Sequence, residues 1–210
     1  MHKKGEVVLQ GNYENINKLR AIDSIVGSVK KLFPDHINNN KKLIYVGLEN
    51  KTFSLSKELK KYFNVDVLSY EICPKVYREA MEVKPNYVEI EFKNLLRHEF
   101  TNEQVYWFDS INCLTNTFVN DITGIVERAN IRNKMVFVVT YVRNGINNVF
   151  TLGAQYSPYK EIRFAELISK AIESEYVTVN NTVISVYANI EKNKPNAGEM
   201  VQVIFEIVKK

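Results

Sequence analysis

Three residues able to do chemistry each follow an apolar run of the sequence. Gly47 closes the run at 43–46, and a glycine at such a place lets a ligand approach the backbone closely. Glu71 ends a second run and lies 24 residues after Gly47, near the spacing at which an acidic residue recognises ribose in α/β nucleotide-binding folds. Asp109 follows the run at 105–108, where a carboxylate can orient a nucleophile or accept its proton.

The turn around Gly47 is poor in glycine. The sequence LIYVGLENKTFSL carries Leu48 and Glu49 at positions where a ligand-gripping turn usually has small residues. Both side chains are expected to narrow the space in which a ligand could approach the backbone of this turn. Two interpretations therefore stay open, a degenerate cofactor turn and an ordinary strand-to-helix turn.

Apolar periodicity predicts a regular series of strands and helices around these residues. One or two amphipathic helices are predicted over 14–33 and end at Pro34, and 35–40 is predicted to be a loop. Strands are predicted at 42–48, 65–72, 87–92, 104–111, 134–142, 182–190 and 200–208. Helices are predicted at 54–63, 74–84, 116–130 and 163–174.

Strand and helix alternate five times before two consecutive strands close the chain. Alternation predicts a mostly parallel sheet with helices on both faces, and the turn-rich segment 193–199 predicts an antiparallel terminal strand pair. The expected fold is a three-layer, Rossmann-like α/β sandwich. Residues 1–40 are expected to form an N-terminal helical extension, and 41–210 the main domain.

Composition restricts the cellular location and the partners of the protein but does not indicate a reaction. The 210 residues carry a net charge of +4, which permits nucleic-acid binding but does not require it. The two cysteines, Cys73 and Cys113, lack the number of a disulfide framework and the spacing of a metal site. No stretch approaches the ~18 apolar residues of a membrane span. We expect a cytoplasmic protein with reduced thiols and no membrane partner.

The order of elements resembles the class I S-adenosylmethionine-dependent methyltransferases over about residues 41–208. The resemblance implies S-adenosylmethionine as cofactor and methyl transfer to an acceptor that is a nucleic acid or a small molecule. The chain lacks the DPPY-like run of family members that methylate exocyclic DNA amines, which disfavours that acceptor. The oligomeric state stays open.

The resemblance also assigns residues to roles. Glu71 would accept hydrogen bonds from ribose hydroxyls, and Asn94 would contact the adenine edge where the family often has Asp. Asp109 and Asn112 would face the acceptor as catalytic residues. The cofactor-binding set implied by the family motifs is Gly47, Leu48, Glu49, Glu71, Ile72, Lys93, Asn94, Asp109 and Ser110.

A ribose 2′-O-methyltransferase subtype has a Lys-Asp-Lys-Glu tetrad. Lys18, Asp109 and Glu206 fall at compatible places, but Arg143 stands where the second lysine is expected, and arginine does not deprotonate usefully.

Aromatic and basic residues in the segment 143–160 could instead stack on and clamp a nucleic acid. They are Arg143, Tyr156, Tyr159 and Lys160.

Two further functions remain open. A chain that keeps the fold without the glycines could be an inactive interaction subunit. Alternatively, Glu91 and Lys93 form an acid-x-lysine triplet that, with Asp66, resembles a Mg²⁺-dependent nuclease site. Trp107 is predicted to lie in the core.

Overall fold

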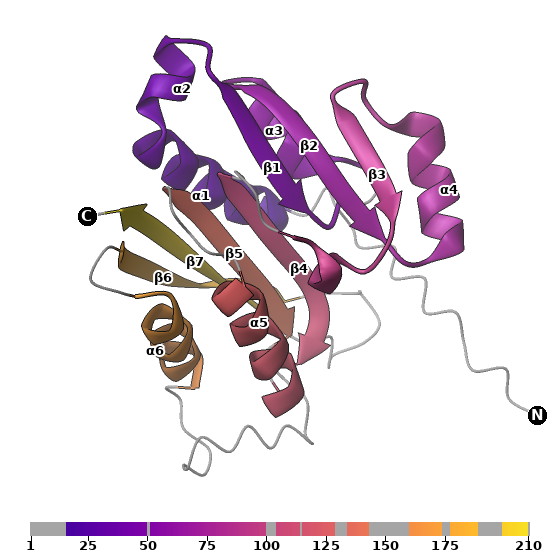
Figure 1. Cartoon of the computed structure of the whole chain (residues 1–210). Coiled ribbons are helices and arrows are strands. Elements are labelled where there is room, and N and C mark those ends of the chain that lie inside the picture. The colour runs from indigo at the N-terminus through magenta and orange to yellow at the C-terminus, as the bar shows by residue number, and fades with distance from the viewer. Residues whose placement is uncertain are drawn as a thin grey trace, which may run out of the picture.

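A seven-stranded sheet forms the centre of the molecule. The computed structural model describes residues 16–49, 51–99, 104–113, 115–128, 134–142, 160–173, 177–188 and 199–209. The strands are β1 (Lys42–Gly47), β2 (Asn64–Glu71), β3 (Val88–Phe92), β4 (Val105–Cys113), β5 (Met135–Val142), β6 (Val177–Ala188) and β7 (Glu199–Lys209). Their spatial order is β3-β2-β1-β4-β5-β7-β6 (Figure 1).

The first five strands run parallel, and β7 runs antiparallel to both of its neighbours, β5 and β6. This confirms the predicted mostly parallel sheet with a terminal antiparallel pair. Strand β6 starts at Val177 and not at the predicted residue 182, because residues 177–181 pair with the end of β7.

Helices cover both faces of the sheet (Figure 1). They are α1 (Ile16–Leu32), α2 (Pro34–Asn38), α3 (Ser54–Lys60), α4 (Pro74–Val83), the 3₁₀ turn η1 (Leu95–Arg97), α5 (Asn116–Arg128) and α6 (Lys160–Ile172). The short helix α2 corrects the loop predicted at 35–40. Pro34 ends α1, but its fixed φ also suits the first position of a new helix. None of the helices in the described residues is long and apolar enough to cross a bilayer.

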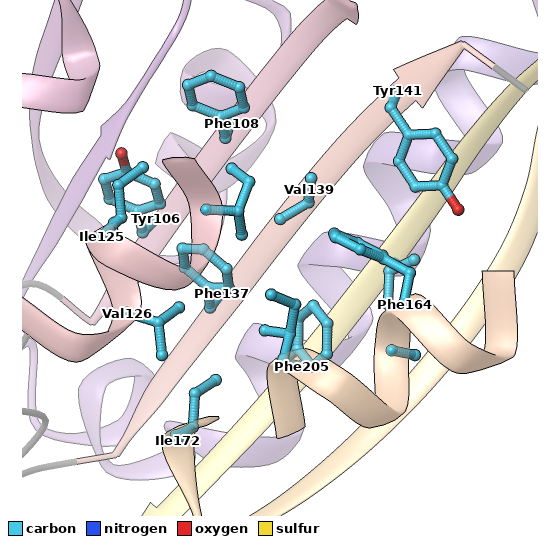
Figure 2. Packing of buried hydrophobic residues seen from close by; sticks show 14 of the residues in the cluster. Tyr106, Phe108, Ile125, Val126, Phe137, Val139, Tyr141, Phe164, Ile172 and Phe205 are labelled. Atoms are coloured by element: carbon cyan, nitrogen blue, oxygen red, sulfur yellow. The ribbon is translucent and has the colours of Figure 1, made fainter. Parts of the chain in front are cut away.

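Two hydrophobic clusters, one on each face, hold the layers together. The α5/α6 face is rich in aromatic rings, as Figure 2 shows, with Tyr106 stacked on Phe137 at a centroid distance of 5.2 Å. The opposite face joins α1 and α3 to the sheet and includes the buried Trp107, as predicted. Because α1 packs directly on this face, it is a structural layer of the sandwich; the boundary drawn at residue 40 stays a prediction.

The backbones of β1 and β4 leave no room for a side chain at Gly47. A Cβ atom on Gly47 would lie 2.5 Å from the Tyr45 hydroxyl oxygen and 2.9 Å from the Trp107 carbonyl oxygen. The backbone N–H of Leu48 donates to that same carbonyl at 3.3 Å. Packing between the two central strands is therefore sufficient to require glycine here, whether or not a ligand binds.

We expect Gly47→Ala to destabilise the fold by about 1–3 kcal/mol, because the Trp107 carbonyl belongs to the sheet backbone and cannot move aside. Gly27→Ala is the matched control, since Gly27 is exposed on α1 and a Cβ there meets nothing within 4 Å. The control should gain about 0.5–1 kcal/mol. Urea unfolding of both variants checks this, and equal effects would contradict it.

Candidate functional site

The sheet order reverses between β1 and β4, and this is where open α/β sheets bind ligands, at the carboxyl ends of the strands. The chain leaves β1 toward β2 and leaves β4 toward β5, so the connections after these two neighbouring strands diverge. Three acidic residues lie at the carboxyl ends of the surrounding strands: Glu49 after β1, Glu71 in β2 and Asp109 in β4.

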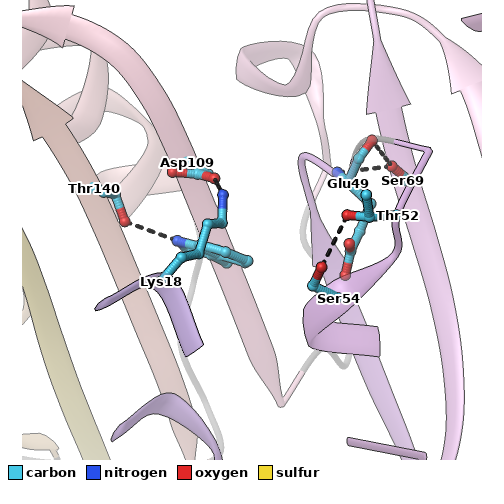
Figure 3. A network of polar contacts seen from close by, with 8 residues as sticks. Lys18, Glu49, Thr52, Ser54, Ser69, Asp109 and Thr140 are labelled. Atoms are coloured by element: carbon cyan, nitrogen blue, oxygen red, sulfur yellow. Dashed lines mark hydrogen bonds and ion pairs between the residues drawn. The ribbon is translucent and has the colours of Figure 1, made fainter. Parts of the chain in front are cut away.

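Glu49 turns back into the protein and caps α3. The side chain is only 5% exposed, and its Oε1 accepts a hydrogen bond at 2.8 Å from the backbone N–H of Ser56 in the first turn of α3. The Glu49 N–H donates at 3.1 Å to the Ser69 hydroxyl on β2 (Figure 3). Phe53, which precedes α3, offers no side-chain cap and has a left-handed φ of 50°. A carboxylate is favourable at a helix N-terminus, so Glu49 fixes the turn from inside.

The half-buried Leu48 side chain also points away from the loop after β1, since it packs against the α5/α6-face cluster. The Glu49 side chain was expected to narrow the path of a ligand along the backbone of this turn. Its carboxyl group instead points to the N-terminus of α3. Sequence reasoning missed this cap because the usual capping residue immediately precedes the helix.

Burial raises the pKa of Glu49 from its ordinary 4.5 to about 7. The Ser56 N–H, the positive charge of Lys18 and the Tyr45 hydroxyl oppose this rise. Tyr45 interacts electrostatically with Glu49, although no well-aligned hydrogen bond to the Tyr45 hydroxyl occurs among the described residues. The carboxyl group thus changes protonation near neutral pH.

Asp109 is held by a lysine from α1. The Lys18 Nζ atom lies 2.8 Å from the Asp109 carboxylate, and the two side chains are only 9% and 16% exposed (Figure 3). Lys18 lies four residues before Ile22, on the same buried stripe of α1 as Ile25. A lysine on an apolar stripe was the signal available in the sequence, because a buried ammonium requires a carboxylate partner.

A row of polar side chains continues from Asp109 across the sheet beneath α1. Asp109 pairs in register with Thr140 on β5, which pairs with Gln202 on β7. The Trp107 indole N–H donates to the Thr140 hydroxyl at 2.9 Å, and the Gln202 amide donates to the Ala21 carbonyl of α1 at 3.2 Å. The buried Gln202 Oε1 has no partner among the residues that the structure describes. This polar row fixes α1 over the end of β4.

Strand β4 becomes irregular directly after Asp109. Four residue steps on β4, from Asp109 to Cys113, match two steps on β5, from Thr140 to Val142. Bulges of this kind are frequent beside ligand sites, where they redirect side chains. The predicted site residues Ser110 and Asn112 belong to this segment, and the structure describes their backbone only.

Glu71 is oriented by its own turn. Its Oε1 accepts hydrogen bonds from the backbone N–H groups of Ile72 at 2.8 Å and Cys73 at 2.7 Å. Within the described ranges the second oxygen, Oε2, has no hydrogen-bond partner, and the neighbouring Ile72 side chain is 64% exposed. The carboxylate is therefore positioned and able to accept hydrogen bonds from a ligand.

Lys93 and Asn94 lie beside Glu71, since Glu71 pairs in register with Phe92 at the end of β3. Asn94 Oδ1 caps the 3₁₀ turn η1 by accepting from the Leu96 N–H at 2.9 Å. The Asn94 amide group is left as a donor, and the Lys93 side chain is exposed. The structure thus groups Glu71, Lys93 and Asn94 at the carboxyl ends of β2 and β3.

The proposed methyltransferase tetrad is not assembled. Lys18 meets Asp109, but Glu206 pairs in register with Val136, at the opposite end of the sheet from Thr140. Glu206 forms an ion pair there with Lys31 at 2.6 Å. The antiparallel direction of β7 causes this separation. Arg143 and the aromatic pair Tyr156 and Tyr159 lie outside the described residues, and nothing of the Lys160 side chain is described.

The nuclease site is not assembled either. Asp66 pairs with Lys42 at 2.7 Å near the start of β2, whereas Glu91 pairs in register with Tyr70, four residues farther along that strand. Four strand residues span about 13 Å, too far to share one metal ion. Across the described ranges, no group of three or more metal-ligating side chains occurs.

Comparisons with known proteins agree with this architecture. By sequence, no protein family and no curated protein matches the chain. By structure, the methyltransferase domain of bacterial CtHen1 is similar at 13% identity and a TM-score of 0.56, covering 90% of this chain and 99% of that one. Magnesium protoporphyrin IX methyltransferase (ChlM) from Synechocystis PCC 6803, a structure with bound S-adenosylmethionine, is similar at 10% identity and a TM-score of 0.53, covering 97% and 86%.

The N-methyltransferase NodS from Bradyrhizobium japonicum WM9 is similar at 7% identity and a TM-score of 0.50, covering 93% of this chain and 99% of that one. At such low identity the similarity concerns the fold alone. The chain has the Rossmann-like fold of class I S-adenosylmethionine-dependent methyltransferases, as its sequence predicts.

We expect the stability of the protein to fall as the pH rises from about 5 to about 7.5, because folded Glu49 binds a proton more tightly than unfolded Glu49. A pKa rise from 4.5 to about 7 corresponds to a loss on the order of 3 kcal/mol. Glu49→Gln should remove this slope, whereas Glu58→Gln, on the helix α3 that Glu49 caps, should keep it. Urea unfolding across this pH range measures both, and parallel curves for the wild type and Glu49→Gln would refute the assignment.

We expect Lys18→Met to cost about 2–4 kcal/mol, because it leaves the Asp109 carboxylate without its partner in a mostly buried place. The double change Lys18→Met with Asp109→Leu should recover much of that loss. Lys31→Met is the control, since Lys31 is 70% exposed in its pair with Glu206 and should cost under about 1 kcal/mol. A strictly additive double variant in thermal or urea unfolding would speak against the buried pair.

Proposed function

We propose that the protein transfers a methyl group from S-adenosylmethionine. The observation that carries the proposal is the set of three oriented acidic residues, Glu49, Glu71 and Asp109, around the point where the sheet order reverses. A sheet of this strand order binds its ligand there.

The residues present fit the nucleoside part of this cofactor. Glu71 is held by two backbone N–H groups and keeps an oxygen available for ribose hydroxyls. The exposed Ile72 side chain would cover one face of the adenine ring. Asn94 uses its carbonyl oxygen in a cap, so its amide N–H groups would donate to a ring nitrogen, with Lys93 at the rim.

The residues also fit the amino-acid part. Gly47 keeps the backbone bare at the end of β1, and Glu49 places its carboxyl group toward α3. Lys18 and Asp109 offer one cation and one anion, which complement the carboxylate and ammonium groups of a methionine moiety. Asp109 would position ligands through its ion pair with Lys18.

S-adenosylmethionine supplies a methyl group that its sulfonium already activates. The protein then has to hold the acceptor in line and exclude water from the path of transfer. The bulged end of β4, with Ser110 and Asn112, would contact the acceptor. The acceptor would be a nucleic acid or a small molecule; among the similar structures, magnesium protoporphyrin IX methyltransferase is named for a small molecule.

A second candidate is an inactive interaction subunit with a methyltransferase fold. The replacement of glycines by Leu48 and Glu49 favours it, because Glu49 already satisfies the first turn of α3. Failure of the protein to bind the cofactor would make this the leading function.

We expect S-adenosylmethionine and S-adenosylhomocysteine to bind the wild type with micromolar affinity, and Glu71→Ala to weaken both by about 10–100-fold through loss of hydrogen bonds to a charged acceptor. Glu82→Ala, a change at an exposed position of the following helix, is the control and should leave binding intact. Isothermal titration calorimetry measures this. A folded wild type that binds neither ligand at millimolar concentration would end the methyltransferase proposal.

A further inference from the structure

A buried tyrosine–histidine pair connects the two chain segments that carry Glu71 and Asn94. The Tyr70 hydroxyl and the His98 Nδ1 atom share a hydrogen bond of 2.8 Å, in which either atom can donate, depending on the tautomer of His98. The two residues are only 2% and 8% exposed. Tyr70 immediately precedes Glu71 on β2, and His98 immediately follows the 3₁₀ turn η1, which Asn94 caps. The bond therefore joins the end of β2 to residues 94–98, referred to below as the η1 segment.

The η1 segment is closed by its own hydrogen bonds. The Leu96 N–H donates to Asn94 Oδ1 at 2.9 Å, and the Arg97 N–H donates to the Asn94 carbonyl at 2.9 Å. The His98 N–H donates to the Leu95 carbonyl at 3.0 Å. Asn94 and His98 thus belong to one compact turn, so a contact that holds His98 in place also holds Asn94.

Aromatic contacts hold His98 from two strands. Its ring lies edge-on to the ring of Tyr70 at a centroid distance of 5.5 Å, and 6.3 Å from the ring of Tyr106 on β4. The buried Leu95 side chain packs in the same cluster as both tyrosines. Apolar packing fills space with little directional preference, whereas a hydrogen bond restricts both distance and angle. The bond between Tyr70 and His98 therefore determines where the η1 segment lies relative to the end of β2.

We propose that Tyr70 and His98 are positioning residues that hold the Asn94 amide group at the base of the bound nucleoside and so give the site its preference for adenine. This inference rests on the proposed function. Glu71 pairs in register with Phe92, two residues before Asn94, so the ribose acceptor and the base-reading group belong to neighbouring strand ends. One nucleoside meets both only if their relative position is held to within about 0.5 Å, which requires supporting hydrogen bonds.

The cap on η1 also fixes which end of the Asn94 side chain faces the base. Asn94 Oδ1 accepts from the Leu96 N–H, so the amide cannot exchange its oxygen and nitrogen without losing this bond. The amide N–H suits the N1 atom of adenine, which is an acceptor. In hypoxanthine a carbonyl replaces the exocyclic amine and N1 carries a hydrogen, so two donors would face each other. A correctly placed Asn94 should therefore distinguish the two bases.

Calorimetric titration of the full chain with S-adenosylhomocysteine and with S-inosylhomocysteine, which differ only in the base, tests the inference. The wild type should prefer the adenine ligand by about tenfold. Tyr70→Phe keeps the buried ring and removes only the hydroxyl. It should weaken binding of the adenine ligand by about three- to tenfold and lower the preference to under about threefold. His98→Asn, whose amide can accept or donate near the Nδ1 position, should keep the preference, and His98→Phe should lose it.

Two comparisons separate positioning from a general loss of stability. Ser169→Ala is the matched control, because it removes a hydrogen bond of 3.0 Å between α6 and Asn181 on β6, at the opposite edge of the sheet from β3. It should lower the midpoint of thermal unfolding but leave both dissociation constants unchanged. In an Asn94→Ala background, Tyr70→Phe should change the affinity by less than about twofold, because the group that it positions is gone.

The outcomes separate the inference from the function on which it rests. If neither ligand binds the folded wild type, the proposed function fails and the inference fails with it. If the wild type binds both ligands equally, or if Tyr70→Phe keeps the wild-type preference, the positioning role alone is wrong. An equal effect of Tyr70→Phe with and without Asn94 would also overturn it. Tyr70→Phe and His98→Phe remove the same bond, so either variant decides the question if the other does not fold.

Discussion

The burial of one lysine ammonium beneath α1 constrains the rest of the structure. Lys18 lies on the apolar stripe of its helix, so α1 can pack on the sheet only where a carboxylate meets that position. Asp109 at the end of β4 provides it, and Thr140 and Gln202 extend the polar row to β7. Gln202 in turn binds the α1 backbone. These contacts align the helix with the carboxyl ends of the central strands, which is where a ligand would bind.

The turn after β1 meets a second requirement without the usual glycines. Gly47 remains because β1 and β4 approach too closely for a Cβ atom, which is a packing constraint. Beyond it, the turn derives its shape from Glu49, whose carboxyl and N–H groups join α3 and β2. Hydrogen bonds of Glu49 therefore determine the shape of this turn, whereas a glycine-rich turn depends on the conformational freedom of its backbone. Glu49 in place of a glycine stabilises the turn, but it adds a buried carboxyl group at the carboxyl end of β1.

The sequence predicted the fold for physical reasons, whereas the roles assigned to the site residues stay predictions. Short apolar runs such as those of β1 and β5 belong to buried parallel strands, and their alternation with helices determines the layers. Side-chain partners were harder to predict, because Lys18 and Asp109 are 91 residues apart and spacing carries no information on such a contact. Glu206 was misplaced because the direction of β7 moves it to the other end of the sheet. The inward turn of Glu49 depends on α3 packing, which no local pattern contains.

The same buried acid connects the stability of the fold to pH. An ionised Glu49 costs the ligand-free fold free energy, since desolvation opposes its charge while Lys18 is already bound to Asp109. As the pH rises through about 7, Glu49 ionises in its buried place and the stability of the fold falls. A glycine at this position would carry no charge, so the turn with Glu49 makes the stability of the fold depend on pH.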